Sequence, residues 1–355
     1  MKILYGVQAT GHGHISRARA MATAFAKHDA EVTWLFSGRE RNHLPDMTPF
    51  GDFEHREGLT FRTAHGRVQH VDTVLKAKPL RFLRDVMQLD LSGYDVVVTD
   101  FEPVTAWAAK RAGVPSVGIG HQYAFGPGVP STGSNIVTRA IMRQFAPAQC
   151  SLGLHWFPYR DNVLPPILDL PDLQRGNAGH ILVYLPFEDQ DTVIQLLNTL
   201  PDTQFVLYSG GVTRARRGNV DCYPTDNMGF KQHLASCRGV LCNSGFELVS
   251  ECLQWGKPLL TRPLAGQTEQ LSNALAIEQL GYGHVMHSLS VEQIQYWLGT
   301  MVQPPAAPFT NVAQCLAAWL AGGMRESIST LQYMLWPVAM THKAPVSGLT
   351  LNRAA

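Results

Sequence analysis

Residues 240–251 read VLCNSGFELVSE, an apolar strand pattern followed by a small-residue turn and the start of an amphipathic helix. A second strand pattern, KPLL, follows at 257–260, and a polar loop with another helix pattern, QTEQLSNA, follows at 267–274. Strands that alternate with helices in this way are typical of a doubly wound α/β sheet. The order of strand, turn and helix also places free backbone amides at a helix start, where they can bind phosphate groups.

This segment supplies candidate nucleotide-binding residues. The amides of Ser244 and Gly245 open the helix and can hold a diphosphate, assisted by the helix dipole. Glu251 lies about 10 Å further along a helix that rises about 1.5 Å per residue, so its carboxylate can reach the ribose hydroxyls. Glu269 and Gln270 follow the next strand and can hydrogen-bond sugar hydroxyls. The alternative is an ordinary βαβα segment in which Glu251 faces solvent.

The N-terminal part of the chain repeats this alternation. An apolar strand pattern at 3–7 precedes the turn Gly11-His12-Gly13-His14, and apolar residues at helical spacing follow the turn. Because glycines allow close approach to the backbone, Gly11 and Gly13 join the candidate nucleotide-binding residues. Further strands are expected at 31–36, 94–99 and 117–119. The sequence therefore predicts an α/β fold of two doubly wound, Rossmann-like domains with a ligand cleft between them.

We place the domain boundaries at changes in this pattern. Residues 1–162 are expected to form the first domain and residues 163–323 the second, with a tail at 324–355 that packs back on the first. A proline-rich passage at 165–171 is followed by RGNAG at 175–179. Prolines fix the backbone and glycines release it, so this passage is the expected hinge.

A general base is expected at the same rim. His14 lies at a helix start, where the helix dipole favours the neutral imidazole that a base needs. Asp100 ends a buried strand, and the carboxyl ends of parallel strands meet at one edge of a sheet. A hydrogen bond between the two would fix the tautomer of the ring and stabilise the imidazolium. The alternatives are that Asp100 caps the next helix and that His14 is a packing or capping residue.

Three more polar residues follow strand ends on this rim. Glu102 comes just after Asp100, and His121 and Gln122 stand at the tip of the next strand. They are candidates for contact with an acceptor or a sugar, with ordinary loop polarity as the alternative.

Composition excludes several classes of protein. Lys plus Arg number 29 and Asp plus Glu 28 in 355 residues, so the strong positive charge of a dedicated nucleic-acid binder is absent. Ser16 replaces the third glycine of the dinucleotide fingerprint, which argues against an NAD enzyme. The six cysteines form no CxxC pair, which favours reduced thiols in a cytoplasmic protein. No signal-like or membrane-spanning apolar run is found in the sequence.

Two further patterns have competing interpretations. The sequence Asp189-Gln190-Asp191 resembles a metal-binding DxD motif, but it directly precedes a helix pattern, where Asp residues serve as caps. An amphipathic helix is expected at 76–91, with its basic side chains on the polar side. That face is either simply solvated or a site for an acidic or membrane-bound acceptor. The basic residues are Lys76, Lys78, Arg81 and Arg84.

Taken together, these motifs resemble the GT-B glycosyltransferases that use sugar nucleotides, in particular the MurG-like N-acetylglucosaminyltransferases and the plant UDP-glycosyltransferases. The resemblance runs from Lys2 to about Tyr282 and is strongest at 239–274. It implies that the donor diphosphate binds at Asn243, Ser244 and Gly245, with Asn243 standing where plant members carry a histidine. Glu251 would bind ribose, Glu269 and Gln270 the donor sugar, and His14 with Asp100 would be the catalytic base and its partner.

The resemblance also implies a reaction. Retaining members carry two glutamates eight positions apart, and Asn243 occupies the place of the partner of Glu251, which favours inversion. We therefore expect an inverting glycosyltransferase that moves a sugar from a nucleoside-diphosphate sugar, the uridine form being the commonest in the family, without metal or cofactor. The expected acceptor is a lipid-linked or cell-envelope glycan, with peripheral contact at the inner face of the membrane. The alternatives are a nucleotide-sugar 2-epimerase and a non-catalytic partner subunit of the same fold.

Overall fold

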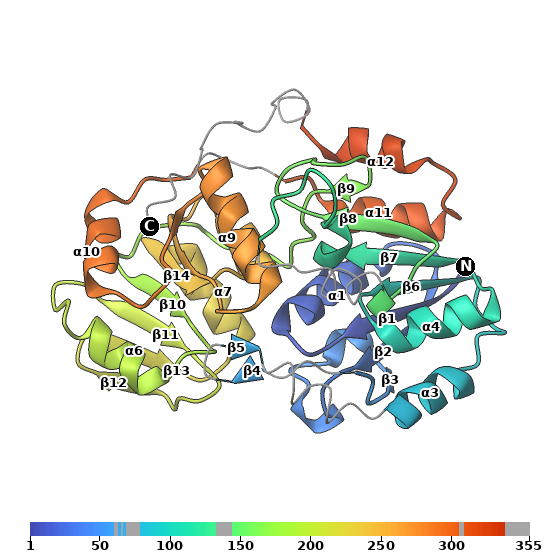
Figure 1. The fold of residues 1–355 in the computed structure, drawn as a ribbon, viewed down its shortest axis with the longest axis horizontal. Helices are drawn as coiled ribbons and strands as arrows, with labels where there is room; N and C mark the ends of the chain where they lie inside the picture. The colour runs from blue at the N-terminus through green and yellow to red at the C-terminus, as the bar shows by residue number, and fades with distance from the viewer. Residues whose placement is uncertain (60–62, 65–66, 69–78, 133–143, 305–308, 338–355) are drawn as a thin grey trace.

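The computed structural model describes residues 1–59, 63–64, 67–68, 79–132, 144–304 and 309–337. Two α/β units lie side by side, and each is built on a central sheet with helices around it (Figure 1). The expected pair of doubly wound domains is confirmed. Lys76 and Lys78 of the expected basic helix lie outside the described residues.

The first sheet has the order β3-β2-β1-β6-β7-β8-β9, and all neighbouring strands in it pair in parallel. Such strands are covered on both faces and so consist of apolar runs; Val96–Asp100, for example, is buried throughout. The strands are β1 (Lys2–Gln8), β2 (Glu31–Ser37), β3 (Glu54–His55), β6 (Val96–Asp100), β7 (Ser116–Gly120), β8 (Cys150–Leu154) and β9 (Val163–Leu164).

The helices of this unit connect the strands. They are α1 (His12–Phe25), α3 (Pro79–Gln88) and α4 (Pro103–Ala112), with short 3-10 turns η1 (Arg41–His43), η2 (Thr48–Phe50) and η3 (His121–Ala124). A separate antiparallel pair joins β4 (Thr63–Ala64) to β5 (Arg67–Val68). The expected amphipathic helix at 76–91 corresponds to α3.

The second sheet has the order β12-β13-β11-β10-β14-β15-β16, with only the β12 pairing antiparallel among those described. Its strands are β10 (Ile181–Tyr184), β11 (Phe205–Tyr208), β12 (Ala215–Arg217), β13 (Val220–Tyr223), β14 (Gly239–Asn243), β15 (Leu259–Arg262) and β16 (His284–Val285). Its helices are α6 (Gln190–Leu197), α7 (Asn227–Ser236), α8 (Phe246–Trp255), α9 (Thr268–Leu280) and α10 (Val291–Thr300).

The C-terminal helices α11 (Val312–Ala321) and α12 (Ile328–Leu335) return to the first unit (Figure 1). The indole Nε1 of Trp336 donates to the carbonyl of Val163 at 2.8 Å. Two expected boundaries are therefore shifted. Strand β9, at 163–164, is the last strand of the first sheet, and α11 packs on α1 although it precedes the expected boundary at 323.

An aromatic contact joins the first unit to helix α8 of the second. The ring of Trp156 stacks on Phe246 of α8 with centroids 5.2 Å apart, and its Nε1 donates to Oγ of Ser250 at 2.7 Å. The connecting segment at 165–178 carries no helix or strand. It is anchored by Lys257, whose Nζ donates to the carbonyl of Gly176 at 2.9 Å. Among the described helices, none combines the length and the apolar character needed to cross a membrane.

Candidate functional site

His14 and Asp100 meet where β1 and β6 end. The neighbouring strands are in parallel register, with Val7 opposite Asp100, so the start of α1 lies over the end of β6. Nδ1 of His14 lies 2.8 Å from Oδ1 of Asp100. The next residue, Phe101, has a left-handed backbone with φ of 52°, which a non-glycine residue rarely adopts outside functional or strained turns. The geometry expected of a base and its partner is therefore present.

Arg17 is a candidate site residue that sequence reasoning missed. Its Nε donates to Oδ2 of Asp100 at 3.0 Å and its Nη2 donates to Oδ1 at 2.6 Å. The side chain is only 2% exposed, and its Nη1 forms an ion pair with Glu247 of α8 in the second unit. The sequence did contain a signal for Arg17: it follows His14 by three positions, and residues three apart on a helix lie on the same face.

The environment of Asp100 favours the carboxylate. Burial alone raises the pKa of Asp100, but the charges of Arg17 and His14, together with their hydrogen bonds, outweigh burial and hold that pKa below its ordinary value. The group is thus a fixed negative charge, as a partner for an imidazolium must be.

The start of α8 carries unpaired polar atoms. Gly245 caps the helix without a side-chain hydrogen bond, and a Cβ built on it meets no atom within 4 Å. Within the described part of the chain, Oδ1 of Asn243 and Oγ of Ser244 are buried without a hydrogen-bond partner. An unpaired buried polar atom costs about 1–3 kcal/mol. These oxygens, next to free helix amides and open space, are what a polar ligand would satisfy.

The starts of α1 and α8 touch across the boundary between the units. A Cβ on Gly13 would overlap the carboxylate of Glu247, so glycine permits this approach. Gly11, the N-cap of α1, is exposed and has open space beside it. The expected anion-binding turns of the two domains are therefore neighbours, with His14 and Asp100 beside them.

The side chain of Glu251 is buried inside the second unit. Its carboxylate is buried and forms an ion pair with Nζ of Lys231 on α7, and each side chain is 5% exposed. Burial raises the pKa of Glu251, and Lys231 works in the opposite direction. The alternative that it faces solvent is wrong. Its contact with ribose stays a prediction, and it requires the carboxylate to share Lys231 with the ligand.

The expected sugar-reading pair separates into two roles. Glu269, in the first turn of α9, accepts a hydrogen bond from Nε2 of Gln122 at 3.2 Å, so one candidate from each unit meets where the units touch. Gln270 is buried, and its Oε1 accepts from the amide of Leu264 at 3.0 Å. Gln270 therefore holds the loop after β15 through this oxygen, and its contact with a sugar hydroxyl stays a prediction.

Glu102 does not face the cleft. Its side chain is fully buried and caps α4, accepting from the amides of Val104 at 2.8 Å and Thr105 at 2.6 Å. Oγ of Ser37 donates to it at 2.6 Å. The expectation that Glu102 contacts an acceptor is therefore wrong. So is the alternative that Asp100 caps this helix, because the left-handed turn at Phe101 gives the capping position to the next residue.

His121 is also closed to an acceptor. The ring is buried, and its nitrogens contact the carbonyl of Leu154 at 2.8 Å and Oδ1 of Asn273 at 2.7 Å. It stacks face to face on Phe246 with centroids 4.0 Å apart. Nδ2 of Asn273 in turn donates to the carbonyl of Ser244 at 3.0 Å. His121 therefore supports the turn before α8 from the first unit, which corrects its expected role.

The DxD-like sequence has a structural role. Asp189 caps α6, accepting from the amide of Thr192 at 2.8 Å, as the capping interpretation expects. Asp191 pairs with Arg217 at 2.7 Å. Both carboxylates are thus engaged with protein groups, and no cluster of three or more potential metal-ligating His, Cys, Asp or Glu side chains occurs in the described ranges.

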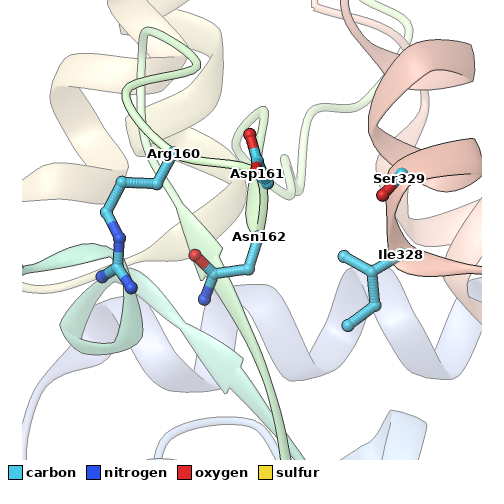
Figure 2. A pocket seen from close by; sticks show the side chains of 5 residues that line it. All are labelled: Arg160, Asp161, Asn162, Ile328 and Ser329. Atoms are coloured by element: carbon cyan, nitrogen blue, oxygen red, sulfur yellow. The ribbon is translucent and has the colours of Figure 1, made fainter.

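A pocket of about 520 Å³ lies away from these residues (Figure 2). It opens between the loop after β8 and the start of α12, and none of the candidate site residues lines it. Its lining side chains are Arg160, Asp161, Asn162, Ile328 and Ser329.

Comparison with known proteins gives a family and a fold. The family model described as glycosyl transferase family 1 matches residues 1–301. No curated protein matches the chain. Among solved structures, the glycotransferase of kitacinnamycin has a TM-score of 0.59 at 16% identity, covering 94% of this chain and 99% of that one.

Two further neighbours were solved with nucleotides. SsfS6 of Streptomyces sp. SF2575, complexed with thymidine diphosphate, has a TM-score of 0.57 at 14% identity, covering 94% of this chain and 99% of that one. LpCGTa, in complex with UDP, has a TM-score of 0.56 at 15% identity, covering 94% and 97%. At these identities the likeness establishes the fold, which is the two-domain GT-B arrangement.

Proposed function

The chain belongs to glycosyl transferase family 1 and is a glycosyltransferase of the GT-B fold, and from this we propose that it transfers a sugar from a nucleoside-diphosphate sugar to a hydroxyl acceptor with inversion. The observation that carries this proposal is the contact between the starts of α1 and α8. It sets the pair His14 and Asp100 beside the turn whose buried oxygens lack partners.

The donor is assigned to the second unit. The backbone amides of the turn at Ser244 and Gly245, together with the positive end of the α8 dipole, suit a diphosphate. The neighbours solved with UDP and thymidine diphosphate support a nucleotide of this kind, and UDP is the first to test. Glu269, held by Gln122, is assigned to the sugar hydroxyls. Glu251 is assigned to the ribose, beside Lys231.

The proposed reaction is a single displacement. The acceptor oxygen attacks the anomeric carbon while the bond from that carbon to the diphosphate breaks, and the nucleoside diphosphate leaves with the electron pair. Nε2 of His14 takes the hydroxyl proton, and Asp100 at Nδ1 stabilises the resulting imidazolium. Amides at the start of α8 stabilise the charge on the leaving group, so the proposal assigns no step to a metal or a cofactor.

Inversion is proposed because the position eight residues before Glu251 carries no carboxylate. Asn243 stands eight positions before Glu251, where a second glutamate would be needed. The carboxamide of Asn243 donates to the carbonyl of Arg262 at 3.0 Å, so it serves the turn. Direct attack by an oxygen activated at His14 inverts the anomeric carbon.

The acceptor is proposed to be a lipid-linked or cell-envelope glycan, reached from the cytoplasmic side of a membrane. Helix α3 supports this assignment, because Leu80, Leu83 and Met87 are exposed by 82%, 55% and 55%. Their spacing of three and four residues places them on one face of the helix, and Arg81 and Arg84 lie between them in sequence. An apolar face flanked by basic residues suits the surface of an anionic bilayer.

The proposal is tested with a panel of nucleoside-diphosphate sugars, following nucleoside diphosphate release with and without polyprenyl-phosphate-linked sugar acceptors. The anomeric configuration of the product is then read by proton NMR. We expect release that depends on acceptor and a product of inverted configuration. A retained configuration would contradict the mechanism. Conversion of the donor sugar to its 2-epimer without acceptor would establish an epimerase instead, and binding without turnover would favour a partner subunit.

A further inference from the structure

Three atoms form a close triangle at the proposed base. Nδ1 of His14 lies 2.8 Å from Oδ1 of Asp100 and also 2.8 Å from Nη2 of Arg17, and that Nη2 lies 2.6 Å from the same Oδ1. A guanidinium only donates hydrogen bonds and a carboxylate only accepts them. Nδ1 must therefore carry a proton to bond Asp100 and must lack one to bond Arg17.

The two partners select opposite tautomers of His14. When Nδ1 donates to Asp100, Nε2 has a free lone pair and can accept the proton of an attacking hydroxyl. When Nδ1 accepts from Arg17, the proton sits on Nε2 and the ring cannot act as the base. The position of the guanidinium thus decides whether the neutral ring is competent.

Glu247 contacts the same guanidinium from the other unit. Its carboxylate, in the first turn of α8, forms an ion pair with Nη1 of Arg17, on the side of the guanidinium away from Nε. Glu247 does not bond Asp100 or His14 in any described contact. Attraction to Glu247 opposes a closer approach of the guanidinium to Nδ1 and so favours Asp100 as the partner of Nδ1.

We propose that Arg17 and Glu247 are positioning residues: their ion pair across the two units keeps His14 in the tautomer that can act as base. The inference rests on the proposed function for its catalytic consequence, whereas the tautomer itself is a property of the protein alone. It also links the approach of the donor unit to the readiness of the base.

Glu247 has a second, opposite effect on the donor. A carboxylate at the start of α8 stands beside the amides assigned to the diphosphate and repels it. Removal of this charge should therefore leave nucleotide binding unchanged or tighter while it harms the base. A residue that only held the fold together would weaken both.

The variant Glu247→Gln separates these effects. It removes the charge but keeps an oxygen that can accept from Arg17, and Glu247 is 21% exposed, so the fold should tolerate it. The matched control is Glu278→Gln, an exposed glutamate on α9 of the same unit. Arg17→Lys is the second variant, because lysine keeps the positive charge and loses the fork that reaches three partners at once.

The direct readout is the tautomer of His14, measured by NMR on protein with isotope-labelled histidine and assigned by loss of its signals in His14→Gln. In the wild type and in Glu278→Gln we expect the proton on Nδ1, and in Glu247→Gln a substantial population with the proton on Nε2. We expect kcat to fall about fivefold, as it would if only a fifth of the molecules carried the competent tautomer, with no increase in KM for the donor. Arg17→Lys should also lower kcat more than it raises KM.

An unchanged tautomer in Glu247→Gln, or a variant with unchanged kcat, would overturn the inference. A rise in KM equal to the fall in kcat/KM would also overturn it, because the residue would then serve binding alone. The proposed function fails in a different way. If His14→Ala retains transfer, His14 is not the base, whereas the tautomer comparison keeps its meaning because it needs no turnover.

Discussion

Nδ1 of His14 lies 2.8 Å from Oδ1 of Asp100, although 86 positions separate the two residues in the chain. The pairing follows from the sheet, because β1 and β6 are neighbours in parallel register and both end at this rim. Helix α8 of the second unit contacts this pair through Arg17, which bonds both Glu247 and Asp100.

The base assignment gives the first expectation. His14→Ala should lower kcat for transfer by about 10²–10⁴, the usual contribution of a general base, because no other group then takes the acceptor proton. Nucleoside diphosphate affinity should be unchanged. His284→Ala, at an exposed histidine on the edge strand β16, is the matched control and should be fully active. Transfer at the wild-type rate in His14→Ala would refute the assignment.

Asp100 should make stability depend on pH. Its pKa is lower in the folded protein than in the unfolded chain, so its contribution is complete above the unfolded pKa of about 4 and is lost as pH falls through the folded value. Asp100→Asn removes one of the two carboxylates that pair with the buried Arg17, the other being Glu247, and the loss of such a partner typically costs about 1–3 kcal/mol at neutral pH.

The free energy of unfolding should therefore differ between wild type and Asp100→Asn at pH 7, and the gap should close below about pH 4. Denaturant titrations at pH 3 and pH 7 measure it. Asp29→Asn, at an exposed aspartate, should show no such gap. A gap that is the same at both pH values would show that Asp100 is not a charged partner of Arg17.

Glu102 should matter for folding and not for the acceptor. Glu102→Gln places an NH₂ group among the donors of Val104, Thr105 and Ser37, so we expect a loss of about 1–3 kcal/mol in unfolding free energy. The folded variant should keep the wild-type KM for the acceptor. Unchanged stability with a raised acceptor KM would show instead that Glu102 contacts the acceptor.

The exposed face of α3 should bind bilayers. The triple variant Leu80→Ser, Leu83→Ser, Met87→Ser should lose at least about tenfold in affinity for vesicles that contain anionic lipid, because apolar burial and attraction of Arg81 and Arg84 act together. Activity on a water-soluble acceptor analogue should stay. Met334→Ser, which removes an exposed methionine on α12, is the control. Equal vesicle binding by the triple variant and the wild type would refute the membrane contact.

Much of the framework could be read from periodicity. Apolar runs such as 96–98 located most strands and the two turns that precede α1 and α8, because parallel strands buried on two faces leave a strong local pattern. The pair His14 and Asp100 could be found for the same reason, since strand ends of one sheet share a rim.

The remaining features depend on contacts that leave no periodic signal. Glu102 and His121 follow strand ends as Asp100 does, yet a left-handed turn at Phe101 and a stack on Phe246 direct them inward. The ion pair of Glu251 with Lys231 joins α8 to α7, and no sequence spacing indicates that these two side chains meet. The expected domain boundaries differ from the structure because β9 pairs with β8 and α11 packs on α1, and neither contact leaves a periodic pattern in the sequence.

The most direct test of the central claim is calorimetric titration of UDP, thymidine diphosphate and the other nucleoside diphosphates into wild type and Gly245→Ala. A Cβ at Gly245 meets no protein atom, and the backbone there, with φ of −73°, accepts alanine, so the variant should fold. Gly299→Ala, on α10 and equally open, is the control.

We expect one nucleotide to bind selectively to the wild type and to Gly299→Ala. In Gly245→Ala its affinity should fall at least about tenfold, or about 1.4 kcal/mol, because the methyl group occupies the space over the helix amides. No binding of any nucleotide to the wild type, or equal affinity in Gly245→Ala, would contradict a donor site at the start of α8.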